Sequence, residues 1–203
     1  MKRDIVLAGV GGQGILSIAN VIGVAALNEK LYLKQAEVHG MSQRGGDVQS
    51  NLRISTSEIN SDLIPFHGAD LILSLEPMEC LRYLPFLAKT GWIVTNTSPF
   101  VNITNYPEMK DIMGELEKID NLVAFDMDAV AKNIGSPKSA NMVLLGAASP
   151  FLGLEVKILD SAIKEIFARK GEKITESNLS AFHEGRKETE NFLRERNKTI
   201  KLI

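Results

Sequence analysis

Cysteine is almost missing from this sequence: Cys80 is the only one among 203 residues. A single cysteine cannot form a disulfide within the chain, and it cannot provide the thiolates that hold an iron–sulfur cluster. Histidine is also scarce, and the three histidines lack the spacing of metal ligands. The chain is therefore predicted to hold no metal of its own. Any electron-carrying centre that it works with is expected in another protein.

The sequence also lacks a strong charge of either sign and a long apolar run. Its formal net charge is -2, which gives no electrostatic reason to expect nucleic acid or an anionic membrane as a partner. No apolar run reaches the ~18–20 residues needed to cross a bilayer. The first 16 residues combine two basic residues with an apolar stretch, but Asp4 and a glycine cluster make them resemble a strand and a loop rather than a signal peptide. We expect a cytoplasmic protein.

Several catalytic motifs are missing as well. No G-x-x-x-x-G-K-[ST] sequence is present, which disfavours a Walker-type NTPase. There is no G-x-S-x-G elbow, and Cys80 lies in a predicted helix. The sequence therefore offers no evident nucleophile for a hydrolase. The chain also has no G-D-G followed by a later asparagine pair, the pattern that indicates thiamine diphosphate binding.

Short apolar runs alternate with helical patterns, and the length suits one sizeable α/β domain. Residues 48–55 alternate apolar and polar, which suggests a half-exposed, antiparallel edge strand. Residues 139–154 are apolar almost all round, which predicts a buried helix. The predicted strands are 4–10, 31–38, 48–55, 69–75, 92–96 and 121–127, and the predicted helices are 15–30, 76–90, 107–119, 128–135, 139–154, 155–171 and 175–198. This order predicts an α/β fold of three α/β/α layers, with a mostly parallel Rossmann-like sheet and a helical C-terminal tail that covers the sheet or a partner.

A glycine motif joins the first strand to the first helix. Gly9, Gly11 and Gly14 spell G-x-G-x-x-G, whose helix N-terminus can face an anion. One interpretation is a dinucleotide site in which Glu37, at the end of the second strand, binds the ribose. The other is that the glycines only permit close packing and the loop covers a partner's site. Gln13 favours the second interpretation or a different ligand, because its side chain can make hydrogen bonds of its own.

The block EVHGMSQRGGDVQSNLRIS at 37–55 is more specific than the glycine motif. Together with GVGGQGIL, ADLILSLEPMECLRYLPFL and NMVLLGA, it resembles the gamma-type domain of 2-oxoacid:ferredoxin oxidoreductases, most of all the small beta subunit of the indolepyruvate type. The resemblance runs in order over roughly residues 4 to 185. It implies that residues 1–203 form a single gamma-type domain.

The same resemblance implies a division of labour between subunits. A large alpha subunit carries thiamine diphosphate, Mg and iron–sulfur clusters, and ferredoxin accepts the electrons. The complex converts a 2-oxoacid such as indolepyruvate, with coenzyme A as co-substrate, to an acyl-CoA and carbon dioxide. This chain is expected to help shape the active-site mouth and the coenzyme A approach.

The resemblance also indicates which residues serve the site. It places cofactor-binding positions at Gly11, Gly12, Gln13, Gly14, Glu37, Gly40, Ser42, Gln43 and Gly45, and candidate contributors to catalysis at His39 and Arg44. Arg44 offers a planar donor group for a carboxylate or phosphate, although a salt bridge within the loop is the alternative. His39 is expected to be a hydrogen-bonding residue more than a proton shuttle. Asn141, which precedes the apolar run 142–148, either caps a helix or faces the same cleft.

Two other functions stay open. The chain could be an independent NAD(P)-dependent oxidoreductase that uses the glycine motif. It could also be a non-catalytic assembly module with a degenerate cleft.

Overall fold

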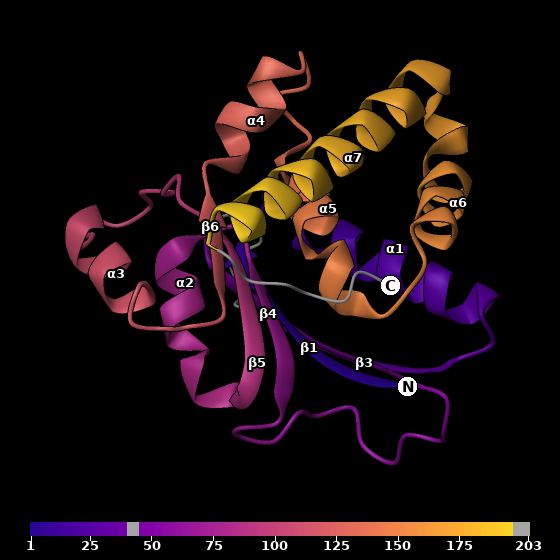
Figure 1. The fold of residues 1–203 in the computed structure, drawn as a ribbon, viewed down its shortest axis with the longest axis horizontal. Coiled ribbons are helices and arrows are strands. Elements are labelled where there is room, and N and C mark those ends of the chain that lie inside the picture. Colours follow the sequence, from indigo (N-terminus) through magenta and orange to yellow (C-terminus); the bar gives the residue numbers. More distant parts are fainter. Residues whose placement is uncertain (40–44, 197–203) are drawn as a thin grey trace.

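The computed structural model describes residues 1–39 and 45–196, and for His39 only the backbone. Its centre is a six-stranded sheet with the order β2-β3-β1-β4-β5-β6 (Figure 1). The strands are β1 (Lys2–Val10), β2 (Tyr32–His39), β3 (Asp47–Ser55), β4 (Ala69–Ser74), β5 (Leu87–Asn96) and β6 (Leu122–Phe125). Parallel pairs join β1, β4, β5 and β6, while β3 runs antiparallel to both of its neighbours. The predicted mostly parallel sheet is confirmed.

Strand β3 is antiparallel, as its pattern suggested, but its predicted place at the edge of the sheet is wrong. It lies between β2 and β1, and β2 is the edge strand. One side of β3 pairs with β2 from Tyr32↔Ser55 to His39↔Val48, and its other side pairs with β1 from Lys2↔Ser55 to Val10↔Asp47. The alternation suggested an edge strand because its polar residues were expected to face solvent. Some of them bond inside the protein instead: Arg53 forms a salt bridge with the buried Asp4 on β1.

The helices are α1 (Ile15–Asn28), α2 (Pro77–Arg82), α3 (Met109–Leu116), α4 (Met127–Asn133), α5 (Ala140–Leu152), α6 (Val156–Phe167) and α7 (Glu172–Glu195), with short 3₁₀ turns at Leu84–Phe86 and Ala168–Lys170. The predicted helix 76–90 was too long: α2 ends at Arg82, and β5 already begins at Leu87. Pro85, in the turn between them, cannot donate a helical hydrogen bond. None of the helices in the described part of the chain is long and apolar enough to cross a membrane.

Strands β1 and β4 are buried on both faces, which explains why they read as continuous apolar runs. On β1, Ile5 and Leu7 belong to a core that includes residues of α1, α5, α6 and α7. Val6 and Ala8 face the other way, into a second core with residues of α2 and α3. Figure 1 shows α2 and α3 on one side of the sheet and α1, α5, α6 and α7 on the other. The predicted three-layer arrangement is confirmed.

The C-terminal helices cover this chain's own sheet, which was one of the two places predicted for them. Helix α5 is buried along almost its whole length and packs against β4 and β5. Helix α7 lies across α5, and Phe182 of α7 is fully buried in the first core. Gly146 and Gly185 stand at this helix crossing, each so close to the other helix that a side chain would collide with backbone atoms.

Candidate functional site

The loops that follow the parallel strands converge at the carboxyl edge of the sheet, where open α/β sheets bind their ligands. A pocket of about 440 Å³ lies there. It is lined by Gly12, Gln13, Leu75, Asn96, Ser98, Pro99, Phe100, Asp128, Pro137, Lys138, Ala140 and Asn141. Three predicted site residues (Gly12, Gln13 and Asn141) are therefore brought together.

Two glycines of the motif have different surroundings: one lies where two helices meet, and the other borders open space. Gly14 has a positive φ of 87°, which favours glycine, and a Cβ there would lie 2.7 Å from Asn141 Nδ2 on α5, so the Asn141 side chain would have to move. Gly12 also has a positive φ, of 105°, but no atom of the described residues lies within 4 Å of a Cβ placed there. The backbone at Gly12 is thus open to a ligand, whereas Gly14 joins two helices.

Gln13 makes hydrogen bonds of its own, as its place in the loop suggested, but both partners are backbone groups. Its Oε1 accepts from the Val10 N–H at 2.7 Å, and its Nε2 donates to the Leu75 carbonyl at 3.1 Å. Because Val10 ends β1 and Leu75 follows β4, Gln13 ties the ends of two neighbouring strands together. It therefore shapes the pocket wall.

The second predicted loop reaches the glycine motif at its described end. The Gly11 N–H donates to the Gly46 carbonyl at 2.8 Å, and the Gly45 N–H donates to the Gly11 carbonyl at 3.3 Å. Asn102 Nδ2 donates to the Gly45 carbonyl at 2.6 Å from the segment after β5. Gly40, Ser42, Gln43 and Arg44, together with the His39 side chain, lie outside the described residues. The two loops named by the resemblance thus meet at Gly11.

Glu37 lies away from the glycine motif. It is exposed on the edge strand β2, where its Oε1 accepts from Gln35 Nε2 at 2.6 Å. Strand β3 separates β2 from β1, so two strand spacings, roughly 10 Å, intervene. A ribose-binding carboxylate stands instead on the strand next to β1. This geometry disfavours the dinucleotide interpretation.

Asn96 is a pocket residue that the sequence did not single out. Only 1% of it is exposed, and its Nδ2 donates to Asp128 Oδ2 at 2.7 Å, with longer contacts of 3.4 Å to two backbone carbonyls. Its Oδ1 accepts from the Met127 N–H at 2.9 Å and from the Ser98 N–H at 3.2 Å. A polar residue closing the apolar run WIVTN was the available signal, because a buried amide at a strand end must find partners.

The part of the pocket at the starts of α1 and α5 favours anions. Helices α1 and α5 both begin there, and neither has an acidic residue in its first turn or a side-chain cap. Helix N-termini carry partial positive charge. Lys138 is exposed in the same wall, and Asn141 Nδ2 donates to the Gly14 carbonyl at 3.4 Å, which joins the two helix starts. Asn141 lines the pocket, and its Oδ1 also accepts from the Met142 N–H at 2.9 Å in the first turn of α5, so the structure shows contacts of both kinds expected of it.

Glu76 is the N-cap of α2. It is fully buried, and its Oε2 accepts from the Glu79 N–H at 2.8 Å. Its Oε1 accepts from the Tyr106 hydroxyl. Burial and this contact raise the pKa of Tyr106. Glu76 therefore anchors the segment after β5 and does not line the pocket described above.

Cys80 lies in α2, fully buried, and burial raises the pKa of its thiol from 9.0 to about 12. We expect native protein at pH 8 to resist thiol-alkylating reagents, and the unfolded chain to react quickly, because the thiolate is the reactive form.

The same burial makes the free energy of unfolding depend on pH, because folding favours the neutral Cys80 thiol. The contribution of the thiol to stability is fully present below pH 9 and is lost as pH rises from about 9 towards 12. At pH 10 the loss is about 1 kcal/mol.

Urea unfolding of the wild type and of Cys80→Ala at pH 8 and pH 10 measures this contribution. The wild type should lose more stability between the two pH values than the variant does. Equal alkylation rates with and without urea would contradict the burial of this thiol.

Within residues 1–39 and 45–196, no three His, Cys, Asp or Glu side chains gather closely enough to hold a metal ion.

The sequence matches the family described as pyruvate ferredoxin/flavodoxin oxidoreductase over residues 4–188. It is 35% identical over 194 residues to "Indolepyruvate oxidoreductase subunit IorB" of Archaeoglobus fulgidus, which covers 91% of this chain and 94% of that protein.

Two solved structures share the fold. The gamma subunit of a keto/oxoacid ferredoxin oxidoreductase from Geobacter sulfurreducens has a TM-score of 0.66 at 25% identity, and the match covers 93% of this chain and 99% of that one. The 2-oxoglutarate:ferredoxin oxidoreductase of Magnetococcus marinus, solved with 2-oxoglutarate, coenzyme A and succinyl-CoA, has a TM-score of 0.74 at 22% identity. The match covers 94% of this chain but only 31% of that longer one.

The family match spans nearly the whole chain, and the alignment with the Archaeoglobus fulgidus protein covers more than nine tenths of both chains. The chain has the same fold as the two solved structures. This chain belongs to the pyruvate ferredoxin/flavodoxin oxidoreductase family, a family of oxidoreductase subunits.

Proposed function

We propose that this chain is the small subunit of an indolepyruvate-type 2-oxoacid:ferredoxin oxidoreductase of the cytoplasm, folded as one gamma-type domain. The observation that carries the proposal is the match to the indolepyruvate oxidoreductase subunit, which extends over almost the full length of both chains. The reaction takes a 2-oxoacid, coenzyme A and oxidised ferredoxin to an acyl-CoA, carbon dioxide and reduced ferredoxin.

The proposal places thiamine diphosphate, Mg and the iron–sulfur clusters in a large partner subunit. When bound there, thiamine diphosphate stabilises the carbanion left by decarboxylation. The composition of this chain supports the division, because its single cysteine is buried in α2 and no thiamine motif is present. What this chain contributes is a rigid wall at the active-site mouth.

Coenzyme A is the ligand that we propose for the pocket at the carboxyl edge. Its phosphates need donors and positive potential, and the uncapped starts of α1 and α5, with Lys138, offer both. The open backbone at Gly12 permits close approach. The residues that line the pocket therefore fit an anionic ligand with polar groups.

The second loop is proposed to complete this site. Its described end, at Gly45 and Gly46, makes two hydrogen bonds to Gly11 of the glycine motif. In this proposal Arg44 contacts an anionic group of the ligand, and His39 is a hydrogen-bonding residue.

Co-expression with the large subunit tests the proposed function. We expect a complex whose visible spectrum shows iron–sulfur absorbance, and whose ferredoxin reduction depends on both coenzyme A and a 2-oxoacid. Indolepyruvate should give a higher kcat/KM than pyruvate or 2-oxoglutarate. The chain purified alone should be colourless and without turnover.

Calorimetry of the isolated chain with NAD(H) and NADP(H) separates this function from the dinucleotide alternative. Tight dinucleotide binding, or turnover by the colourless chain alone, would contradict the proposal. A complex that forms but never reduces ferredoxin with any 2-oxoacid would favour the assembly module.

A further inference from the structure

Asp128 is the only acidic residue among the described residues that line the pocket. It is the second residue of α4, and it is exposed. Its Oδ2 accepts from Asn96 Nδ2 at 2.7 Å. Within the described part of the chain, no hydrogen bond is made to its Oδ1. One carboxylate oxygen is thus held by the protein while the other is available to a ligand.

Asn96 holds this carboxylate in a defined orientation. Two backbone N–H groups, from Met127 and Ser98, donate to the Asn96 Oδ1. A backbone N–H cannot accept a hydrogen bond, so the amide oxygen must point towards these donors and Nδ2 must face Asp128. Because Asn96 is almost fully buried, little freedom is left for its rotation. The orientation of Asp128 is therefore set by the ends of β5 and β6.

The charges around the pocket define what Asp128 can bind. The wall formed by α1, α5 and Lys138 favours an anion, whereas Asp128 repels one. An ionised carboxylate only accepts hydrogen bonds, and such charge-assisted bonds are stronger than neutral ones. The pocket therefore suits a ligand that has an anionic group at one end and an N–H or O–H donor at the other.

We propose that Asp128 is a ligand-binding residue of this pocket, and that Asn96 is the positioning residue that aims it. Asp128 Oδ1 accepts a hydrogen bond from an N–H or O–H of coenzyme A while the phosphates lie towards α1 and α5. This inference rests on the proposed function. Coenzyme A has suitable donors in both halves, in the amides of its pantetheine arm and in its adenosine.

Steady-state kinetics of the reconstituted complex tests the assignment with Asp128→Asn. We expect the KM for coenzyme A to rise about tenfold, as the loss of a charge-assisted hydrogen bond implies. The kcat and the KM for the 2-oxoacid should change by less than about twofold. A role confined to the stability of α4 would not separate the two KM values in this way.

Asp126→Asn is the matched control. Asp126 caps the same helix, accepting from the Ala129 N–H at 2.8 Å through Oδ1, and it does not line the pocket. The control removes the same charge from the same helix start and keeps a capping oxygen. It should leave both KM values unchanged.

Two competitive inhibitors locate the donor on coenzyme A. Adenosine 3′,5′-bisphosphate represents the nucleotide half and pantetheine the other half. The inhibition constant of only one of them should rise about tenfold in Asp128→Asn. Asn96→Ala should weaken the same inhibitor, and it should also lower the thermal midpoint, because several buried hydrogen bonds are lost with it.

The outcomes separate this inference from the proposed function. If the wild-type complex turns over but Asp128→Asn keeps the KM for coenzyme A within about twofold of the wild type, the inference is wrong and the function stands. A change of equal size in Asp126→Asn also overturns it. A wild-type complex without any coenzyme A-dependent turnover would overturn the function, and the inference with it.

Discussion

Replacing Gly146 with alanine is expected to lower the free energy of unfolding by about 3 kcal/mol. A Cβ at this position would lie 1.8 Å from the carbonyl oxygen of Phe182 on α7. The obstructing atom is backbone, so it cannot rotate away, and α5 and α7 must move apart. In an unobstructed helix the same substitution stabilises by up to about 1 kcal/mol, so steric conflict reverses the sign.

The cost extends beyond one contact because the same crossing holds several interactions. At Gly185, on the other helix, a Cβ would lie 2.0 Å from the Val143 carbonyl oxygen. Thr189 Oγ1 donates to the Ala147 carbonyl at 3.0 Å, close to the same contact. Separating the helices stretches this buried bond and loosens the packing of Phe182.

Urea denaturation followed by circular dichroism measures the effect, with Gly114→Ala as the matched control. Gly114 lies inside α3, and no atom of residues 1–39 or 45–196 lies within 4 Å of a Cβ placed there. That variant should be more stable than the wild type by about 0.5–1 kcal/mol. If both alanine variants gained stability, the close crossing of α5 and α7 would be contradicted.

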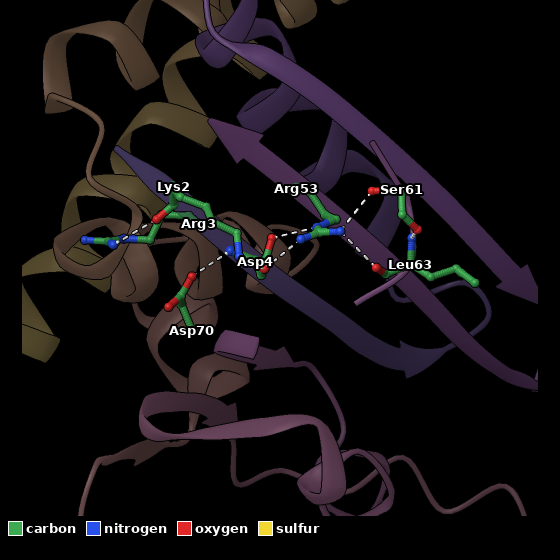
Figure 2. Close-up of polar contacts among 7 residues, drawn as sticks. All are labelled: Lys2, Arg3, Asp4, Arg53, Ser61, Leu63 and Asp70. Atoms are coloured by element: carbon green, nitrogen blue, oxygen red, sulfur yellow. Dashed lines mark hydrogen bonds and ion pairs between the residues drawn. The ribbon is translucent and has the colours of Figure 1, made fainter. Parts of the chain in front are cut away.

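Arg53→Met is expected to lower the free energy of unfolding by about 3 kcal/mol. Figure 2 shows the reason: the guanidinium meets Asp4 with two parallel hydrogen bonds, of 2.7 and 3.0 Å. The Asp4 side chain is 1% exposed and that of Arg53 13%, so the substitution leaves a buried carboxylate without its main partner. Arg53 Nη1 also donates to the Ser61 and Leu63 carbonyls at 2.9 and 3.0 Å, which fixes the long connection between β3 and β4.

The paired control is Lys2→Met, which removes another cation from the same carboxylate. Lys2 Nζ lies 2.8 Å from Asp4 Oδ2, but its side chain is 60% exposed. Its loss should cost less than about 1 kcal/mol. The double variant Asp4→Leu/Arg53→Met should be more stable than Arg53→Met alone, because no buried charge is left unpaired. Equal effects of the Arg53 and Lys2 substitutions in chemical denaturation would contradict this account.

Local patterns were sufficient for most of the architecture. Apolar runs such as 4–10 and 69–75 predicted buried strands because parallel strands are covered on both faces, and their alternation with helices implied the layers. The two loop sequences were specific enough to indicate the family. These features depend on residues near one another in the chain, so they can be read without the fold.

The order of the strands depended on contacts between distant residues. The pattern of 48–55 resembled an edge strand because a side chain such as Arg53 looks solvated until its partner, 49 residues away, is known. The same misplacement made Glu37 look like a neighbour of the glycine motif, although β3 stands between them. Sequence periodicity reports which residues are buried, but not which strand lies beside which.

Some pocket residues could be predicted from the sequence, whereas others became apparent only in the folded structure. Its glycines and Asn141 could be named from their positions in the chain. The pairing of Asn96 with Asp128 could not, because it joins the ends of two strands that meet only when the sheet forms. Hydrogen-bond geometry at the carboxyl edge arises from the packing of the whole sheet, and therefore the roles of these two residues appear only in the folded chain.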